Sequence, residues 1–512
     1  MLFLLGCMDW SILDLKDHDT GVPADTGELA EVVPAVEDTG GGSTADTADT
    51  GGSEDTAPPI DTGPEPVPCA DELLSGRDDD GNGEVDDLYA AEAAAELYSS
   101  EGRHLGYRLE DLGDQDGDGL TDLGVSGIYA MNGSESRDSG RVFVVPGGTC
   151  GERDVDELPT LHGEHDEGAS VALTSLGDVD GDGWDDLAVG APTHTWHNTS
   201  VLPRVYVVHG PVQSDAQLAD VAEATLVSES STYGFGAALS TTDVTDDGTA
   251  DLLVGARGYP DWSGSVLVYE GPVSGSLVTA DATARLAGDG YAAVTCVVGD
   301  MDGDGRDEVG VGEYGHADGK GALTLVTGPL SGTVDLTSEA LRVVGDQADD
   351  RLGAACQGLD WNGDGHADLV GMASGAGETR IWLSDGSLPS SLTLSADVHI
   401  GSTTSHGSSV YSTMRALDDL DGDGDAELIV GDGGYNGMQG RAVLLYGGLA
   451  DGTYDLDTVS DTVLEGADAD SRFGFSFALG HVDSDGVLDL FVSAPGENEG
   501  DKSRVYGFVT GF

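Results

Sequence analysis

The sequence predicts an all-β fold, a seven-bladed β-propeller of four-stranded blades, and three observations lead to this prediction. One sequence phrase occurs seven times at a nearly constant interval, each copy contains four strand-like segments, and 80 of the 512 residues are glycine. A fixed period is typical of architectures in which each repeat is one supersecondary unit. Long amphipathic helical patterns are few, so strands and turns are expected to dominate.

The repeated phrase is an acidic, glycine-rich loop followed by an apolar segment, as in GDVDGDGWDDLAVGAP at 177–192. The first position of this loop falls at residues 114, 178, 243, 300, 360, 419 and 481. The intervals between these positions are therefore 64, 65, 57, 60, 59 and 62 residues. This regularity predicts a single repeat domain over residues 94–512.

Each unit has four strand-like segments in the same order. A segment of small residues precedes the acidic loop, as in FGFSFAL at 473–479, and an apolar segment follows it, as in DLAVGAP at 186–192. A third segment alternates, as in GRVFVVPG at 140–147, and a fourth resembles ATLVSE at 224–229. Four short strands separated by glycine-rich turns are typical of a propeller blade.

The seventh unit ends after its third strand, whereas AAELYSS at 94–100 precedes unit one where a fourth strand belongs. We expect this segment to complete the last blade and to close the ring, because closure removes exposed strand edges. Its alanine-rich composition also permits a helical linker, and that alternative stays open.

Three segments precede the repeats. Residues 1–7, MLFLLGC, resemble the end of a bacterial lipoprotein signal in which Cys7 is lipidated, although no basic segment precedes them. A truncated signal and a chance match are both open. Residues 8–67, rich in Asp, Thr, Gly and Pro, are expected to be a disordered linker, either a tether or an ordinary tail. Residues 68–90 contain an acidic, metal-binding-like motif with oxygen-bearing side chains at Asp78, Asp80, Asn82 and Asp86.

The charge of the chain excludes two classes of partner. Its 96 acidic residues against 20 basic ones give a formal net charge of −76. Nucleic acids and anionic membranes would repel such a chain, so membrane contact is expected only through a lipid anchor at Cys7. Disorder, a salt-adapted surface or carboxylates gathered around cations can each account for the acidity.

The cysteines are few and scattered. They are Cys7, Cys69, Cys150, Cys296 and Cys356, and none forms a CxxC pair. This pattern does not indicate a disulfide framework or a zinc site. Cys296 and Cys356 each lie four residues before the first position of a loop, so they are equivalent in neighbouring units. We expect both to be small core residues, and a bridge between them is the alternative.

The acidic loop has the composition of a cation site. In the second unit Asp178, Asp180, Asp182 and Asp186 occupy positions 1, 3, 5 and 9, with Gly181 before and Gly183 after Asp182. Glycine permits the tight coiling that turns alternate side chains toward one centre. An oxygen-only set of carboxylates, with the position-7 carbonyl of Trp184, suits Ca²⁺ better than Mg²⁺ or zinc. Position 12 already lies in a strand, so the loop is not an EF-hand, and metal-free Asx-turns are the alternative.

The order of FG-containing strand, DxDxDG loop and GAP-containing strand resembles the FG-GAP repeat of integrin α-subunit propellers and their bacterial relatives. The resemblance extends over about residues 95–512 in seven units. It implies a seven-bladed propeller with calcium in hairpin loops on one face. About five to seven structural Ca²⁺ ions are expected.

The expected ligands differ between units. Units one, two, four and six have complete sets: Asp114, Asp116, Asp118, Asp122; Asp178, Asp180, Asp182, Asp186; Asp300, Asp302, Asp304, Glu308; Asp419, Asp421, Asp423, Glu427. Unit five has Asp360, Asn362, Asp364, Asp368, in which Asn362 still offers an oxygen. Unit three has Asp243, Thr245, Asp247, Asp251, and weaker binding is expected there. Unit seven has His481 at position 1 with Asp483, Asp485, Asp489, and its site is the doubtful one.

The ions are expected to be structural, because a carboxylate cage without a nucleophile does not perform hydrolysis. The sequence contains no GxSxG, HExxH or P-loop motif, and no catalytic residue is assigned. We therefore expect a monomeric, calcium-stabilised binding or adhesion module, extracellular or on a bacterial surface, that recognises a protein or glycan through propeller loops. The alternative is a secreted carbohydrate- or ester-active enzyme that uses the channel mouth. Five tryptophans have two alternative roles, either lining a sugar-binding face or packing between blades: Trp184, Trp196, Trp262, Trp361 and Trp382.

Overall fold

The computed structural model describes residues 93–510, apart from several short segments. Those outside the described residues are 101–104, 129–138, 166, 194–200, 230–233, 260–262, 293, 340, 389–390, 394, 402–412, 418, 421, 460–461, 484 and 497–502. The expected lipoprotein signal, linker and 68–90 motif therefore lie outside the described residues, as do Cys7, Cys69 and the candidate ligand Asp421.

Seven sheets follow one another in sequence order, and each contains the four strands of one unit. The innermost strands are β2 (Leu105–Asp111), β7 (Ala172–Gly177), β12 (Phe235–Thr242), β17 (Val294–Gly299), β22 (Leu352–Leu359), β26 (Met414–Leu417) and β31 (Phe477–Gly480). The second strands are β3 (Leu123–Gly127), β8 (Asp186–Ala191), β13 (Asp251–Ala256), β18 (Glu308–Gly312), β23 (Asp368–Ala373), β27 (Glu427–Asp432) and β32 (Asp489–Ala494). The third strands are β4 (Arg141–Val145), β9 (Arg204–Val208), β14 (Ser265–Tyr269), β19 (Ala322–Val326), β24 (Glu378–Trp382), β28 (Arg441–Leu445) and β33 (Arg504–Phe508). The fourth strands are β6 (Thr160–His162), β11 (Ala224–Val227), β16 (Ala284–Ala287), β21 (Arg342–Val344), β25 (Val398–Gly401), β30 (Thr462–Glu465) and β1 (Ala95–Tyr98).

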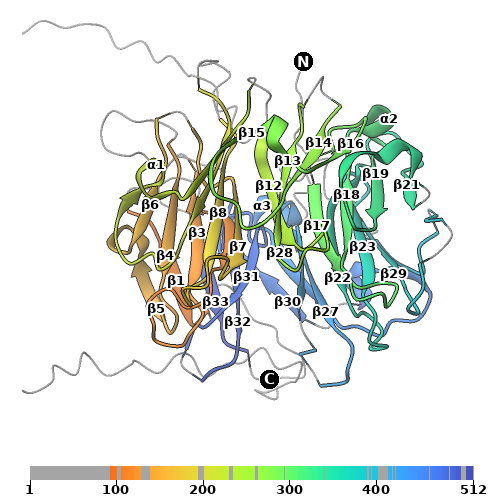
Figure 1. The fold of residues 1–512 in the computed structure, drawn as a ribbon. Coiled ribbons are helices and arrows are strands. Elements are labelled where there is room, and N and C mark those ends of the chain that lie inside the picture. Colours follow the sequence, from red (N-terminus) through yellow and green to blue (C-terminus); the bar gives the residue numbers. More distant parts are fainter. Residues whose placement is uncertain are drawn as a thin grey trace, which may run out of the picture.

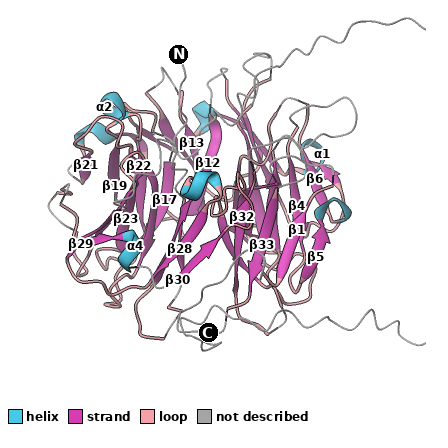
Figure 2. Cartoon of the chain, turned by 180° about the vertical axis from the view of Figure 1, so that it is seen from behind, coloured by secondary structure: helices cyan, strands magenta, loops and turns pink. Residues whose placement is uncertain are grey.

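The innermost strands contact their neighbours all the way around a ring. Figures 1 and 2 show the sheets standing side by side from two opposite directions. The contacts of β2 with β31 join the first blade to the last. The seven-bladed β-propeller predicted from the sequence is confirmed.

Ring closure uses the segment that the sequence places there. Strand β1 pairs antiparallel with β33, with Ala95 opposite Gly507 and Tyr98 opposite Arg504. The fourth strand of blade seven therefore comes from the N-terminal side of the repeats, and the expectation of a completing strand is correct. The alternative of a helical linker is wrong for residues 95–98.

The second strands are buried along their whole length in every blade. Each lies between two neighbouring blades, which explains why these segments are continuously apolar instead of alternating. Trp361 and Trp382 pack within this core, where they are 0% and 5% exposed. Blade packing is therefore the role of these two tryptophans. Trp184 is half-buried in a loop, and Trp196 and Trp262 lie outside the described residues.

A close backbone contact between blades explains two glycines of the repeated phrase. A Cβ added to Gly190 in β8 would lie 2.0 Å from the carbonyl oxygen of Gly236 in the next blade. The same holds for Gly431 and Gly474, where the separation would be 1.8 Å. Gly236 and Gly474 have φ angles of 82° and 84°, which L-residues with a side chain rarely adopt. The glycines of the FG and GAP segments are thus required where one blade meets the next.

Five of the seven sheets carry a fifth strand that the sequence did not predict. These strands are β5 (Gly151–Asp154), β10 (Ala216–Gln217), β15 (Gly275–Val278), β20 (Gly332–Asp335) and β29 (Gly452–Asp455). Each comes from the connection between the third and fourth strands of one blade and pairs in parallel with the fourth strand of the preceding blade. The fifth strands cover outer edges and link neighbouring blades.

The helices of the described residues are short and lie in connections. They are η3 (Val155–Glu157), α1 (Leu218–Val221), η4 (Thr279–Asp281), α2 (His316–Gly319), η5 (Leu336–Ser338), α3 (Tyr435–Met438) and α4 (Leu456–Val459). Five of them, η3, α1, η4, η5 and α4, follow directly after the fifth strands. In the described part of the chain, no helix has the length and apolar character to cross a bilayer.

The expectation that Cys296 and Cys356 are separate core residues is wrong, because the two form a disulfide. They lie on β17 and β22, whose equivalent positions face each other in neighbouring blades, and their Cα atoms are 5.7 Å apart. That distance falls within the range that a disulfide spans. The bridge therefore links the inner strands of blades four and five covalently.

Candidate metal centres

The acidic loops connect the first strand of each blade to the second, so all seven lie on one face of the propeller. The connections between second and third strands lie on the opposite face, because the strands are antiparallel. Position 6 of every loop is a glycine, with φ between 86° and 102°. This backbone conformation is readily available only to glycine, which explains the invariant spacing of the motif.

The position-1 carboxylate organises each loop that has one. In loop two, Asp178 accepts hydrogen bonds from the backbone N–H groups of Gly181, Asp182 and Gly183 at 2.7–3.0 Å. The N–H of the position-6 glycine reaches position 1 in six loops, at 2.8–3.0 Å. These bonds wrap the backbone of the loop around one carboxylate.

The position-9 carboxylate fixes the loop to its blade. It is at most 2% exposed in all seven loops. In every loop it accepts the backbone N–H of position 2, at 2.5–3.0 Å. In five loops it also accepts an N–H from the end of the third strand or just beyond it, as from Gly210 to Asp186 at 2.9 Å. This residue therefore has a structural role in addition to the ligand role expected from the sequence.

Burial makes the charge of five of these carboxylates unfavourable without a cation. It raises the pKa of Asp122 and of Asp489 to about 6, and the pKa of Glu308 and of Asp368 to about 7. Burial also raises the pKa of Asp186. A divalent cation beside such a group would stabilise its ionised form. The loops thus combine converging oxygen ligands with an electrostatic reason to bind a cation.

Four loops bring three carboxylates together, with one oxygen of each within 4.8 Å of the others. The groups are Asp114, Asp116, Asp122; Asp178, Asp180, Asp186; Asp300, Asp302, Asp304; and Asp419, Asp423, Glu427. These loops belong to units one, two, four and six, the four whose expected ligand sets are complete. Three further expected ligands, Asp118, Asp182 and Glu308, lie outside the groups, and Asp421 is not among the described residues.

The donor sets of these four loops fit calcium. All donors are carboxylate oxygens, which Ca²⁺ prefers, and the side chains of positions 1, 3 and 5 are at the solvent-facing end of a hairpin. No cysteine or histidine belongs to any of the four groups, so soft or nitrogen-preferring metals are less well matched.

The other three loops differ at the positions that the sequence singles out. In loop three, the Thr245 hydroxyl donates to the position-9 residue Asp251 at 3.4 Å. In loop five, the Asn362 side-chain amide donates to Asp364 at 3.1 Å. Each contact uses a carboxylate oxygen that a cation would otherwise take. Weaker binding was expected from the sequence only for loop three, and it stays a prediction.

Loop seven uses His481 in a different way. Its Nδ1 accepts the backbone N–H of Thr121 in loop one at 2.7 Å, so the ring is turned toward the neighbouring blade. The His481 carbonyl also accepts the N–H of Gly148 at 2.9 Å. The side chain at position 1 therefore joins blades seven and one and does not face the centre of its own loop.

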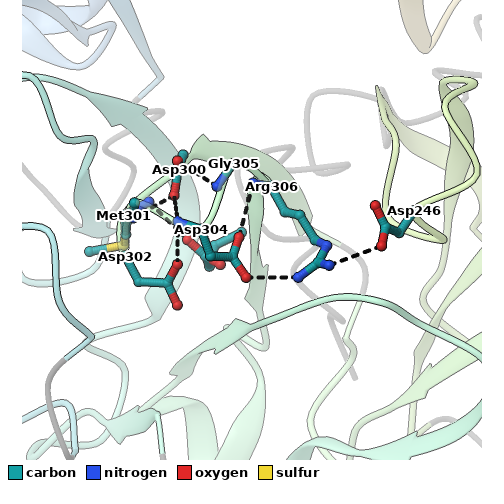
Figure 3. A network of polar contacts seen from close by, with 9 residues as sticks. Asp246, Asp300, Met301, Asp302, Asp304, Gly305 and Arg306 are labelled. Atoms are coloured by element: carbon teal, nitrogen blue, oxygen red, sulfur yellow. Dashed lines mark hydrogen bonds and ion pairs between the residues drawn. The ribbon is translucent and has the colours of Figure 1, made fainter.

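Contacts between loops were missed by the sequence analysis. Figure 3 shows Arg306 of loop four between Asp304 of the same loop, at 2.8 Å, and Asp246 of loop three, at 3.0 Å. Gln115 of loop one donates to the carbonyl of Asp185 in loop two at 2.8 Å. His209 lies 2.9 Å from the expected ligand Asp180. Positions 2 and 7 vary in sequence between units, and no repeated signal marks these partners.

Comparison with known proteins agrees with this architecture. The model of the FG-GAP repeat matches residues 171–208, 235–269 and 473–508, which are the first three strands of blades two, three and seven. Integrin alpha-PS2 of Drosophila melanogaster is 37% identical over 164 residues, covering 30% of this chain and 12% of the relative. Phosphatidylinositol-glycan-specific phospholipase D of Mus musculus is 33% identical over 144 residues, covering 26% of this chain and 17% of the relative.

The matches thus span less than a fifth of the length of these two relatives. A solved structure, BBS1N in complex with ARL6DN, aligns with a TM-score of 0.43 at 11% identity, covering 81% of this chain and 93% of the other. The family model and the curated relatives agree on the repeat that the sequence predicts. The protein carries FG-GAP repeats, which form a seven-bladed β-propeller similar in sequence to part of integrin α subunits.

Proposed function

We propose that the protein is a calcium-stabilised binding module that acts outside the cell and recognises a protein or glycan through loops of its propeller. The observation that carries the proposal is the convergence of three carboxylates in each of loops one, two, four and six. Three carboxylates whose oxygens lie within 4.8 Å of one another repel unless a cation neutralises them, and in loops one, two and six one of the three is buried. A structural ion at each hairpin would relieve that repulsion on one whole face of the ring.

The ions would stabilise the fold and would not take part in chemistry. Each loop joins the innermost strand to the second strand, so an ion there restrains the two strands that form the interblade core. Binding energy for the folded state then adds directly to stability. Loops one, two, four and six would bind most tightly and loop three more weakly. Asn362 would still offer an oxygen in loop five, whereas loop seven has His481 in place of a position-1 carboxylate.

An extracellular location is supported by two observations. The Cys296–Cys356 disulfide is of a kind that persists in oxidising compartments and is rare in the cytosol. The similarity to integrin α subunits points the same way. A lipid anchor at Cys7, a tether over residues 8–67, metal binding by the 68–90 motif and a monomeric propeller remain predictions from the sequence.

The binding role follows from the division of the two faces. If the acidic hairpins hold ions, the loops between second and third strands on the opposite face are free to vary and to contact a partner. The relatives named as integrins support a binding or adhesion role for such a propeller. The identity of the partner is left to experiment.

Thermal unfolding of the full chain in calcium, in magnesium and in chelator tests the metal part of the proposal. We expect a large rise in the midpoint that is specific to calcium. Equal midpoints in all three solutions would overturn it. Screening the calcium-loaded chain against extracellular proteins and glycans tests the recognition part. Retention of the chain by a partner would support it, provided that chelator, which unfolds the propeller, abolishes the retention.

One observation favours a second function, a secreted carbohydrate- or ester-active enzyme that uses the channel mouth. The matched relative in mouse is named as a phospholipase D, although the match covers only 17% of its length. Incubation of the calcium-loaded chain with phosphodiester, carboxylic ester and polysaccharide substrates tests this function directly. Product formation that copurifies with the chain would support the enzymatic function.

A further inference from the structure

The central channel contains a cavity that the calcium proposal does not involve. It has a volume of about 470 Å³ and is lined by the inner strands of the blades. Ligand sites in proteins commonly have volumes of about 300–1,000 Å³, so the cavity can hold a small molecule.

The charge of this cavity is opposite to that of the chain. Its lining includes three arginines, Arg108, Arg257 and Arg415, and a single acidic residue, Glu110. The whole chain has only 20 basic residues against 96 acidic ones. A concentration of cationic side chains in the channel is therefore unexpected from composition, and it marks a place where an anion is electrostatically favoured.

Two of the arginines form no ion pair with a described carboxylate, although the charge of Arg108 acts on Glu110 and partly offsets the effect of burial on the pKa of that residue. Arg415 pairs with Asp111 at 3.2 Å and lies 3.8 Å from Glu110. By contrast, neither Arg108 nor Arg257 forms an ion pair with any described residue. Arg257 donates to the hydroxyl of Tyr314 at 3.0 Å, across blades three and four. The backbone N–H of Arg108 is bound to Ser126, whereas its guanidinium has no hydrogen-bond partner among the described residues.

The position of Arg108 directs it to the cavity. It lies on the innermost strand β2, half-buried between the buried residues Tyr107 and Leu109, and both Arg108 and the half-buried Glu110 line the cavity. Neutral polar groups complete the wall, among them the hydroxyls of Thr174 and of the hydrogen-bonded pair Ser240 and Thr295, which are 3.0 Å apart. Burial also raises the pKa of Glu110 to about 7, which reduces the opposing negative charge near neutral pH.

We propose that the channel binds a small organic carboxylate, of about the size of a sugar acid, with Arg108 as its main anchor and Arg257 as a second cationic contact. A guanidinium presents paired N–H donors that match a carboxylate, and a partly desolvated site strengthens that bond. The hydroxyl groups of the wall would bind the remaining oxygens of the ligand. This site lies apart from the proposed metal loops and does not depend on which macromolecule the propeller recognises.

The test is calorimetric titration of the full chain in calcium with glucuronate, citrate and succinate, and with glucose as the neutral probe. At least one of the three carboxylates is expected to bind with one site per chain, and glucose to bind at least about tenfold more weakly. Absence of saturable binding by all three at millimolar concentration would overturn the proposal.

A pair of variants separates a specific site from general attraction. Arg108→Gln keeps the backbone bond to Ser126 and should weaken carboxylate binding by about tenfold or more. Arg153→Gln removes the same charge from the exposed outer strand β5 and should leave binding unchanged. Equal weakening by both would overturn the proposal. If Arg108→Gln does not fold, as judged by circular dichroism, Arg257→Gln takes its place, and unchanged affinity in that variant would also overturn it.

Discussion

Loops four and seven form the same kind of hairpin, but the side chain at position 1 has a different role in each. In both, a buried position-9 carboxylate accepts the N–H of position 2, from Met301 to Glu308 at 2.8 Å and from Val482 to Asp489 at 2.7 Å. In loop four, Asp300 at position 1 gathers the backbone around itself and lies close to two more carboxylates. In loop seven, His481 reaches across to Thr121 in blade one. One side chain thus separates a candidate cation site from a contact between blades.

The comparison implies that position 9 supports the hairpin and position 1 creates the site. The hairpin survives the loss of the position-1 carboxylate in loop seven, because its position-9 residue still binds two backbone N–H groups of the loop and one beyond it. Changes at position 9 should therefore damage both kinds of loop, whereas changes at position 1 should affect calcium only where a cluster exists.

The largest effect is expected for position 9. Asp186→Ala and Asp489→Ala should each lower the free energy of unfolding in chelator by about 3 kcal/mol, because each leaves buried backbone N–H groups without an acceptor. Denaturant unfolding measures the loss. Glu152→Ala on the exposed strand β5 is the matched control and should have little effect.

A loss below about 1 kcal/mol for Asp489→Ala would contradict a supporting role that is independent of metal. The Asp186→Ala substitution should lower the free energy of unfolding more in calcium than in chelator, since it also removes a ligand. The Asp489→Ala substitution should lower the free energy of unfolding by the same amount in both solutions.

The next effect concerns position 1. Asp300→Ala should release one calcium ion and lower stability in excess calcium by about 2 kcal/mol, while His481→Ala should release none and lose about 1 kcal/mol through the bond to Thr121. Equilibrium dialysis counts the ions, and thermal unfolding reports the stability. If His481→Ala also releases an ion, the distinction between the two loops fails.

The reverse change is expected to have a smaller effect on stability. His481→Asp restores a carboxylate at position 1 of loop seven and should add one calcium ion per chain. The gain in stability should stay within about 1 kcal/mol, because the new ion replaces the hydrogen bond to Thr121. An unchanged ion count would show that another feature of loop seven prevents binding. His481→Asn, which adds an oxygen without a charge, is the matched control.

The smallest effect is a dependence on pH. Burial raises the pKa of Glu308 and of Asp368 to about 7. At pH values between their ordinary pKa and this raised pKa, the calcium-free folded chain therefore holds more protons than the unfolded chain. Stability in chelator should therefore rise modestly as the pH falls from 8 to 6. Calcium affinity should fall over the same interval, because the ion must displace those protons. Calcium affinity that is equal at pH 8 and pH 6 would contradict the raised pKa values.

Features encoded within one repeat could be predicted from the sequence. The period, the four strands, the closing segment at β1 and the four loops that bring three carboxylates together all follow from local patterns, such as alternation, glycine spacing and carboxylate spacing. The FG and GAP glycines are visible in the sequence as well, and the structure adds the reason, which is the close contact of Gly190 with Gly236.

Features created by the contact of neighbouring blades could not be settled from the sequence. The fifth strands are short, exposed segments such as GTVD at β20, which have no apolar alternation and become strands only because a free edge lies beside them. The Cys296–Cys356 bridge depends on the spacing of two inner strands, and the orientation of His481 depends on an N–H group 360 residues away. The contact of His481 has no local signal, whereas the equivalent positions of Cys296 and Cys356 made a bridge one of two alternatives without deciding between them.

The most direct test of the account is the location of calcium in crystals of the full chain grown with excess calcium, determined from anomalous scattering. The account predicts ions in loops one, two, four and six, each bound by the position-1 and position-3 carboxylates, and none in loop seven. Crystals without ions in those four loops, or with an ion bound in loop seven beside His481, would contradict it.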